Sequence, residues 1–309
     1  LNMARRRATK RKTPRRRNSK TLNAVNVAQT YLQTAILTRA AFNVNPLEFI
    51  TGQQTIAGSK YGQVGTGPGN PDQTTPEAVN AIAASHVFFG YGPYLDRLTL
   101  RDDQRRVASD NREELARAKD ALMTAASGEQ VCVVSGGDPG VFAMAAAVCE
   151  AIEDGPPAWR ELELSIVPGV TAMLAVAARA GAPLGHDFCA ISLSDNLKPW
   201  TVIEQRLRAV ATAGLVIALY NPISKARPWQ LGSAFSILRE VLPWTTPVIF
   251  GRAAGRPDEA ISVVSLADAD PAKADMATCV VIGSPETRVI ERPNQAPLVY
   301  SPRSLGAPK

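Results

Sequence analysis

The sequence predicts an α/β protein built from two α/β domains with mostly parallel sheets. From about residue 61 onward, short continuous runs rich in Val and Ile alternate with stretches of helical periodicity. Such alternation is typical of parallel sheets covered by helices on both faces. The length of 309 residues allows about two domains of ~150 residues each. The segment 181–187, rich in Gly and Pro, offers a boundary, so we expect domains at residues 61–180 and 181–303.

Residues 1–60 form an extension of different composition. Residues 1–20 hold ten basic residues and no acidic residue, whereas the other 289 residues carry 24 basic and 28 acidic residues. The net charge of +6 therefore describes a slightly acidic protein with a basic tail, and it does not indicate nucleic-acid binding by the whole molecule. We expect residues 1–20 to be disordered, and the apolar spacing within residues 24–42 predicts one amphipathic helix.

Three interpretations of this extension stay open. It can be a basic arm that binds nucleic acid through phosphates, an organellar presequence, or an addition without a catalytic role. If nucleic acid is a partner, we expect only residues 1–20 to bind it. The sequence contains no run of about 18 apolar residues, so we expect no membrane-spanning helix. The four cysteines are far apart and form no CxxC pair, which favours reduced thiols in the cytoplasm over disulfides or a metal site.

The strands and helices follow from apolar runs and capping signals. Thr75 followed by Pro76 predicts a helix start, since proline suits the first helical position. Asp110 and Glu113 have the spacing of a capping box, before a helix with Leu115, Ala118 and Leu122 on one face. Further helices are expected near 140–153, 171–180, 201–212 and 228–241. The apolar runs predict strands at 131–135, 162–169, 214–221, 246–251 and 278–283.

Four loops rich in Gly or Pro follow predicted strands, where parallel sheets bind ligands. The first loop fits neither the dinucleotide fingerprint, because Asn70 stands at the third glycine position, nor a phosphate-binding P-loop, because it lacks the GK[ST] ending. The segment before it, residues 57–64, is less apolar than a buried strand, so the integrity of the first strand is left open. The loops are VGTGPGNPD (64–72), SGGDPG (135–140), VPGVTA (167–172) and LYNP (219–222).

Together with four longer segments, these loops resemble the tetrapyrrole methylase family, which uses S-adenosyl-L-methionine. The similarity covers about residues 61–303 and is greatest to the branch that methylates ring carbon 17 of precorrin-3B, with ring contraction, in cobalamin biosynthesis. It implies a cofactor in the cleft between two α/β domains, a tetrapyrrole substrate and a homodimer. The segments are GYGPYLDRL (90–98), GAPLGHDFCAISLSD (181–195), ALYNPISKARPWQL (218–231) and AGRPDE (254–259).

The resemblance also implies a set of cofactor-binding residues on the loops. Thr66, Asn70 and Ala253 depart from the residues usual in the family, which puts their contacts in question. Backbone loops can hold a methyl donor in line with a carbon nucleophile without titrating, so proximity is the main catalytic factor expected. The implied cofactor-binding residues are Pro68, Gly136, Gly137, Asp138, Val141, Thr171, Ala172, Asn221 and Ala254.

Candidates for acid–base and substrate-binding roles lie in the same segments. The sequence does not rank the acid–base candidates, which are Tyr91, Asp96, His186, Asp195 and Arg252. A substrate with many carboxylates needs cations, and arginine binds carboxylates through two parallel hydrogen bonds. The candidate cations are Arg97, Lys198, Lys225 and Arg227, with Arg101, Arg105 and Arg106 close to the first of them.

Two other functions remain as alternatives. A related superfamily member acting on ribosomal RNA would match the basic tail, but the catalytic portion is net acidic, whereas RNA-binding domains are usually basic. The other alternative is a fusion in which the basic arm binds nucleic acid independently of the enzyme.

Overall fold

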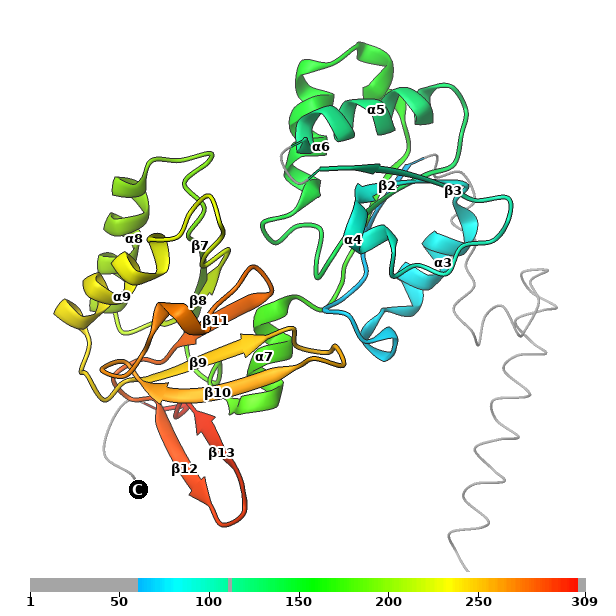
Figure 1. The fold of residues 1–309 in the computed structure, drawn as a ribbon. Coiled ribbons are helices and arrows are strands. Elements are labelled where there is room, and N and C mark those ends of the chain that lie inside the picture. Colours follow the sequence, from blue (N-terminus) through cyan, green and yellow to red (C-terminus); the bar gives the residue numbers. More distant parts are fainter. Residues whose placement is uncertain (1–60, 111–112, 305–309) are drawn as a thin grey trace, which may run out of the picture. The chain divides into compact units, whose positions relative to one another are not determined.

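A computed structural model describes residues 61–110 and 113–304 (Figure 1). Within these residues the chain forms two five-stranded sheets and one three-stranded sheet, with helices packed on the larger two. The predicted α/β class is confirmed. The basic tail and the helix expected at 24–42 lie outside the described residues. No helix within residues 61–110 or 113–304 is both long and apolar enough to cross a membrane.

The first sheet is parallel throughout and has the strand order β3-β2-β4-β1-β5. Strand β1 is buried along its whole length and pairs with β4 at every residue, so the first strand is intact from Tyr61 onward. The sequence expectation missed two of these strands, β2 and β3. The strands are β1 (Tyr61–Gly65), β2 (Val87–Tyr91), β3 (Arg105–Ser109), β4 (Val131–Ser135) and β5 (Leu164–Val167).

Helices cover both faces of the first sheet. Residues of α3 and α4 share one apolar core with Val64 and Phe88, and residues of α5 and α6 share another with Tyr61 and Val133. Because successive side chains of a strand point to opposite faces, Val64 and Tyr61 of the same strand pack into different cores. The helices are α3 (Pro76–Ala84), α4 (Gly92–Leu95), α5 (Glu114–Ala126) and α6 (Met144–Asp154).

The two predicted helix starts had different outcomes. Thr75 caps α3, since its side-chain oxygen accepts a hydrogen bond from the backbone N–H of Ala78 at 3.1 Å. The start at Asp110 was wrong: α5 begins at Glu114, and Leu115 is exposed. Glu113 keeps half of the capping box, because its carboxylate accepts from the backbone N–H of Asp110 at 3.0 Å.

The strand order creates a switch point between β1 and β4. The connection from β1 runs through α3 to β2, and the connection from β4 runs through α6 to β5, so the two leave in opposite directions along the sheet. They also cover opposite faces. In open α/β sheets this arrangement leaves a crevice at the carboxyl ends of the two strands, where ligands bind. The loops at residues 66–70 and 136–141 begin at this crevice.

The second sheet has the order β10-β9-β11-β8-β7. Within residues 188–282 only the β7–β8 pair is parallel, and the other pairs are antiparallel. The expectation of parallel strands therefore holds for the first sheet but not for most of the second. A short connection, such as the one between β9 and β10, can join only antiparallel neighbours. The strands are β7 (Phe188–Ser192), β8 (Val216–Tyr220), β9 (Pro247–Arg252), β10 (Ala260–Ser265) and β11 (Thr278–Ile282).

Helices again cover both faces of the second sheet. α8 (Trp200–Thr212) and α9 (Gln230–Val241) bury one face, and α7 (Ala172–Ala180) buries the other (Figure 1). The sequence boundary at residue 181 assigned α7 to the first domain, although this helix contacts β9, β10 and β11. A boundary before α7 would keep the helix with the sheet that it covers.

A small sheet follows at the carboxyl-terminal end of the described chain. It joins β12 (Arg288–Arg292), β13 (Gln295–Tyr300) and the two-residue strand β6 (Gly181–Ala182) in the order β12-β13-β6. β12 and β13 form an antiparallel hairpin (Figure 1).

Candidate functional site

The loops after β1 and β4 are joined backbone to backbone. The N–H of Gly67 donates to the carbonyl of Gly137 at 3.1 Å, and the N–H of Gly137 donates to the carbonyl of Gly67 at 2.7 Å. Both residues have positive φ, 73° and 69°, which other residues rarely adopt. A Cβ on Gly65 would lie 2.6 Å from the carbonyl oxygen of Gly137. Glycine is therefore required here both for conformation and for close approach.

The loop after β5 packs against the same pair. A Cβ on Gly169 would lie 2.2 Å from the carbonyl oxygen of Gly137. The carboxylate of Asp138 accepts from the N–H of Gly140 at 2.8 Å with one oxygen and from the N–H of Gly169 at 3.1 Å with the other. Both oxygens of Asp138 thus hold backbone in place, and the three loops form one unit.

The first turn of α7 faces this unit. A Cβ on Gly137 would lie 3.7 Å from Cα of Thr171 and 3.9 Å from the backbone N of Ala172. Among the described residues, the N–H of Ala172 has no hydrogen-bond partner, as is usual in a first helical turn. A helix amino terminus facing a glycine loop suits a ligand with an anionic group, and a side chain at Gly137 would fill that space. These residues fit a small cofactor that carries a carboxylate.

Tyr220, at the end of β8, fixes this turn of the helix. Its hydroxyl lies 2.6 Å from Oγ1 of Thr171 and accepts from the N–H of Met173 at 2.9 Å. Burial raises the pKa of Tyr220 to about 12, so it stays neutral and hydrogen-bonded at physiological pH. The sequence expectation missed this residue, although it stands directly before Asn221 in the LYNP segment.

Two further cofactor-binding candidates, Ala254 and Val141, lie near Tyr220 or next to a residue that contacts it. Ala254 belongs to the apolar cluster that includes Ala172 and Tyr220. Val141 precedes Phe142, whose exposed ring lies 5.2 Å from the ring of Tyr220, measured between centroids.

Asn221 and Pro68 are fixed by hydrogen bonds. Asn221, next to Tyr220, has a φ of 50°, and its side-chain amide donates to Oγ of Ser192 at 2.9 Å. Pro68 is buried, and its carbonyl accepts from Nε of Arg256 at 3.3 Å.

The acid–base candidates are dispersed. No hydrogen bond or ion pair joins any two of the five within the described part of the chain. Arg252 is held by Asp275 at 2.7 Å and by Asp258 at 2.9 Å, and these hydrogen bonds raise its pKa. Both carboxylate oxygens of Asp195 accept from the side-chain amide of Gln230. An arginine tied to two carboxylates is suited to fixing the end of β9 and not to proton transfer.

The other three acid–base candidates have few polar contacts. Nδ1 of His186 accepts from the neighbouring N–H of Asp187 at 2.8 Å, which makes it a loop anchor. The ring of Tyr91 lies edge-on to that of Tyr94, with 5.5 Å between centroids, and Asp96 is exposed at the end of α4.

The candidate cations also divide by environment. Lys198 donates to the carbonyl of Ser194 at 3.3 Å, and burial together with the charge of Arg206 lowers its pKa. Arg227 donates to the carbonyl of Asn221 at 3.2 Å, and Lys225 is exposed.

Arg97 lies over the ring of Tyr94, 5.4 Å from its centroid. Its neighbours in sequence have other roles: Arg101 pairs with Asp103, Arg105 pairs with Glu129, and Arg106 donates to the carbonyl of Leu98.

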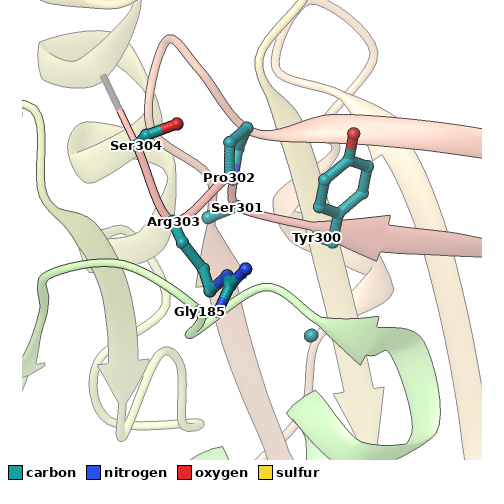
Figure 2. A pocket seen from close by; sticks show the side chains of 7 residues that line it. Gly185, Tyr300, Ser301, Pro302, Arg303 and Ser304 are labelled. Carbon is teal, nitrogen blue, oxygen red and sulfur yellow. The ribbon is translucent and has the colours of Figure 1, made fainter. Parts of the chain in front are cut away.

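A separate pocket lies beside the small carboxyl-terminal sheet. Figure 2 shows the residues around it, which include Gly185, Tyr300 and Arg303. None of the implied cofactor-binding residues lines it. The glycine loops have the backbone features of a ligand site and this pocket does not, so we place the functional site at the loops. Within residues 61–110 and 113–304 no group of three or more His, Cys, Asp or Glu side chains is arranged to hold a metal ion.

Known proteins of one family resemble this chain. Residues 63–270 match the family described as Tetrapyrrole (Corrin/Porphyrin) Methylases. A precorrin-3B C(17)-methyltransferase of Sinorhizobium sp is 72% identical over 240 residues, which cover 78% of this chain and 94% of that protein. A probable cobalt-factor III C(17)-methyltransferase of Salmonella typhimurium is 36% identical over 241 residues, covering 78% of this chain and 97% of that protein.

A solved methyltransferase structure is also similar to this chain. The crystal structure of the methyltransferase CobJ is 49% identical, with a TM-score of 0.75, and the match covers 79% of this chain and all of that one. The matched family, the close relatives and the paired glycine loops lead to one conclusion: the chain belongs to the tetrapyrrole methylase family.

Proposed function

We propose that this chain transfers the methyl group of S-adenosyl-L-methionine to ring carbon 17 of precorrin-3B, with contraction of the macrocycle, in cobalamin biosynthesis. The observation that carries the proposal is the 72% identity over 240 residues with a relative named for this reaction. The three joined loops support it, because they supply a backbone-lined site of the kind that this chemistry needs. A homodimer and a cytoplasmic location stay predictions.

The cofactor is assigned to the unit formed by the loops at 65–70, 136–141 and 168–172. When bound, S-adenosyl-L-methionine supplies an electrophilic methyl group. The N–H of Ala172 at the start of α7 is placed to bind a carboxylate, and Gly136 and Gly137 allow close approach of backbone to ligand. Asp138 orients the loops through Gly140 and Gly169, and we assign it a positioning role and no direct contact.

The residues at this site act mainly by orientation. Holding two reactants in line contributes at most about 7–11 kcal/mol to lowering a barrier, and it requires no titrating residue. The rigid backbone pairing of Gly67 with Gly137 suits this role, because it fixes the ligand position without mobile side chains. Tyr220 and Thr171 hold the facing helix at the correct distance.

The test uses the full chain with methyl-labelled S-adenosyl-L-methionine and precorrin-3B. We expect label in the macrocycle and a changed absorption spectrum. A parallel reaction with cobalt-factor III tests the metal-containing substrate named for the Salmonella relative, and we expect slower transfer. Folded protein that binds S-adenosylhomocysteine but transfers no label to precorrin-3B would refute the proposal.

A further inference from the structure

Arg256 reaches from the second sheet to the first glycine loop. It lies in the connection between β9 and β10 and is half-buried. Its Nε donates to the carbonyl of Pro68 at 3.3 Å, and its Cγ lies 2.7 Å from the position that a Cβ on Gly69 would occupy. Glycine at 69 therefore leaves room for the arginine stem, and the stem fixes the guanidinium beside the loop.

Arg97 lies beside the second glycine loop. It directly follows the C-cap of α4, and its guanidinium carbon lies 5.4 Å from the ring centroid of Tyr94. The same ring packs on Gly136, where an added Cβ would lie 2.8 Å from Cε1 of Tyr94. Tyr94 thus connects Arg97 to the backbone of the cofactor loop.

The charge of Arg256 acts on Arg97, and neither arginine forms an ion pair within the part of the chain that the structure describes. The pKa of Arg97 is lowered, first by burial and then by the positive charge of Arg256. Asp258 also acts on the charge of Arg97, but its carboxylate is already bound by Arg252 at 2.9 Å. Within residues 61–110 and 113–304, neither Arg97 nor Arg256 has a carboxylate within 4.0 Å.

Some other arginines in the described part of the chain do have a carboxylate partner. Arg179 pairs with Glu259 at 2.9 Å, and Arg208 pairs with Glu240 at 2.7 Å. Two like charges held close together disfavour each other, and an anionic ligand between them removes that cost. Guanidinium groups suit a carboxylate, because their planar donors match its two oxygens.

We propose that Arg97 and Arg256 together bind one peripheral carboxylate of the tetrapyrrole substrate, one arginine from each side of the paired glycine loops. This inference rests on the proposed function and names a substrate contact for it. The carboxylate is assigned to the substrate and not to the cofactor, because the first turn of α7 already offers the cofactor carboxylate a position. Arg256 is thereby a specificity-determining residue that the sequence expectation did not include.

The first arm of the test measures catalysis and cofactor binding separately. The variants are Arg97→Gln, Arg256→Gln and the double variant, with Arg288→Gln on the exposed strand β12 as a matched control. We expect each single variant to raise the KM for precorrin-3B about 10- to 100-fold, the range for a lost hydrogen bond to a charged group. The dissociation constant for S-adenosylhomocysteine should change much less than the KM for precorrin-3B, because Arg256 touches the cofactor loops through Pro68 and Arg97 does so only through Tyr94, while both charges are assigned to the substrate.

Two further variants separate charge from shape. Arg97→Lys and Arg256→Lys keep the charge, so they should recover part of the lost substrate affinity. The double Gln variant should lose less than the product of the two single effects, because both arginines hold the same carboxylate. A fall in S-adenosylhomocysteine affinity as large as the fall in substrate affinity would contradict the assignment, as would unchanged KM values in both single variants.

The second arm does not depend on catalysis. Tryptophan fluorescence is titrated with uroporphyrin III, a tetrapyrrole polycarboxylate, and with its methyl ester. The wild-type chain should bind the free acid more tightly, and Arg97→Gln and Arg256→Gln should each reduce that difference. Equal binding of acid and ester by the wild-type chain would refute this inference even if methyl transfer is observed. An inactive chain that still prefers the acid would refute the proposed function alone.

Discussion

The hydroxyl of Tyr220 lies 2.6 Å from Oγ1 of Thr171, joining the end of β8 to the residue that precedes α7. The same hydroxyl accepts the N–H of Met173 at 2.9 Å, so one oxygen satisfies two groups of the first helical turn. Thr171 is the N-cap residue of α7, but its side chain accepts no hydrogen bond from a backbone N–H of the helix. The hydroxyl of Tyr220, on β8, accepts one instead, as a capping side chain would. The position of this turn, which faces Gly137, therefore depends on a residue 49 positions away.

Replacing Tyr220 with Phe should destabilise the protein and weaken cofactor binding. The change leaves Oγ1 of Thr171 and the N–H of Met173 without this partner, which costs about 1–3 kcal/mol of unfolding free energy. The affinity for S-adenosylhomocysteine should fall because the first turn of α7 loosens. Chemical denaturation and titration calorimetry measure the two effects. The control is Tyr300→Phe on β13, whose hydroxyl has no hydrogen-bond partner among the described residues. Equal stability of the two variants would contradict the role of Tyr220.

Replacing Gly169 with Ala should disrupt the loop unit. The added methyl group would lie 2.2 Å from the carbonyl oxygen of Gly137, and backbone atoms on both sides must shift to accept it. We expect a loss of about 1–3 kcal/mol of unfolding free energy, the usual cost of overpacking, together with weaker binding of S-adenosylhomocysteine. Thermal denaturation gives the first and calorimetry the second. Gly92→Ala is the control, because a Cβ there meets no atom within 4 Å. If both variants behave alike, the close approach at Gly169 has no energetic consequence.

Replacing Asp138 with Asn tests whether this residue orients the loops. An amide can accept only one of the two N–H groups that the carboxylate accepts, from Gly140 and Gly169. The unfolding free energy of the cofactor-free protein should fall by about 1.5–3 kcal/mol, the range for hydrogen bonds to a charged group. Urea denaturation without ligand measures it, with exposed Asp102→Asn as control. Unchanged stability combined with lost cofactor binding would instead mean direct contact between Asp138 and the cofactor.

Alkaline pH should lower the stability of the protein. Burial raises the pKa of the Cys279 thiol from 9.0 to about 12 and that of the Cys189 thiol to about 11. At a pH between the ordinary thiol pKa of 9.0 and these raised values, the unfolded chain loses protons that the folded chain retains. The free energy of unfolding therefore decreases as pH rises from about 9 to about 12. Urea denaturation at pH 8 to 10 follows the start of this decrease.

The contribution of Cys279 can be isolated by mutation. Cys279→Ala should flatten the dependence of the unfolding free energy on pH, whatever its effect at neutral pH, because the buried thiol is removed. Exposed Cys149→Ala is the control and should leave the slope unchanged. A slope that is identical in the wild-type chain and in Cys279→Ala would show that this thiol stays protonated in both states.

Much of the fold and part of the site could be predicted from local sequence. The continuous apolar run at 131–135 predicted β4 to the residue, and Thr75 with Pro76 predicted the start of α3. These features are local, since periodicity and caps depend on neighbours in sequence. β3 was missed because its residues are mostly exposed at the sheet edge and form no apolar run.

The site was predicted as a set of loops but not as a set of contacts. The glycines at 136 and 137 were assigned to the cofactor, and the structure shows why glycine is needed: other backbone lies too close, or φ is positive. Asp138 was assigned to the cofactor as well, whereas its two oxygens bind Gly140 and Gly169. Arg252 was a catalytic candidate, but it forms ion pairs with Asp258 and Asp275, which suit a structural role.

The sequence by itself determined the class of fold and the family, and it predicted the loops that we propose as the ligand site. Only the tertiary structure decided which distant groups meet: Arg256 with Pro68, 188 positions apart, and Tyr220 with Thr171. It also decided that most pairs of the second sheet are antiparallel. The physical reason is that residue type and periodicity set local conformation and burial, whereas strand order and the direction of each connection set the long-range contacts.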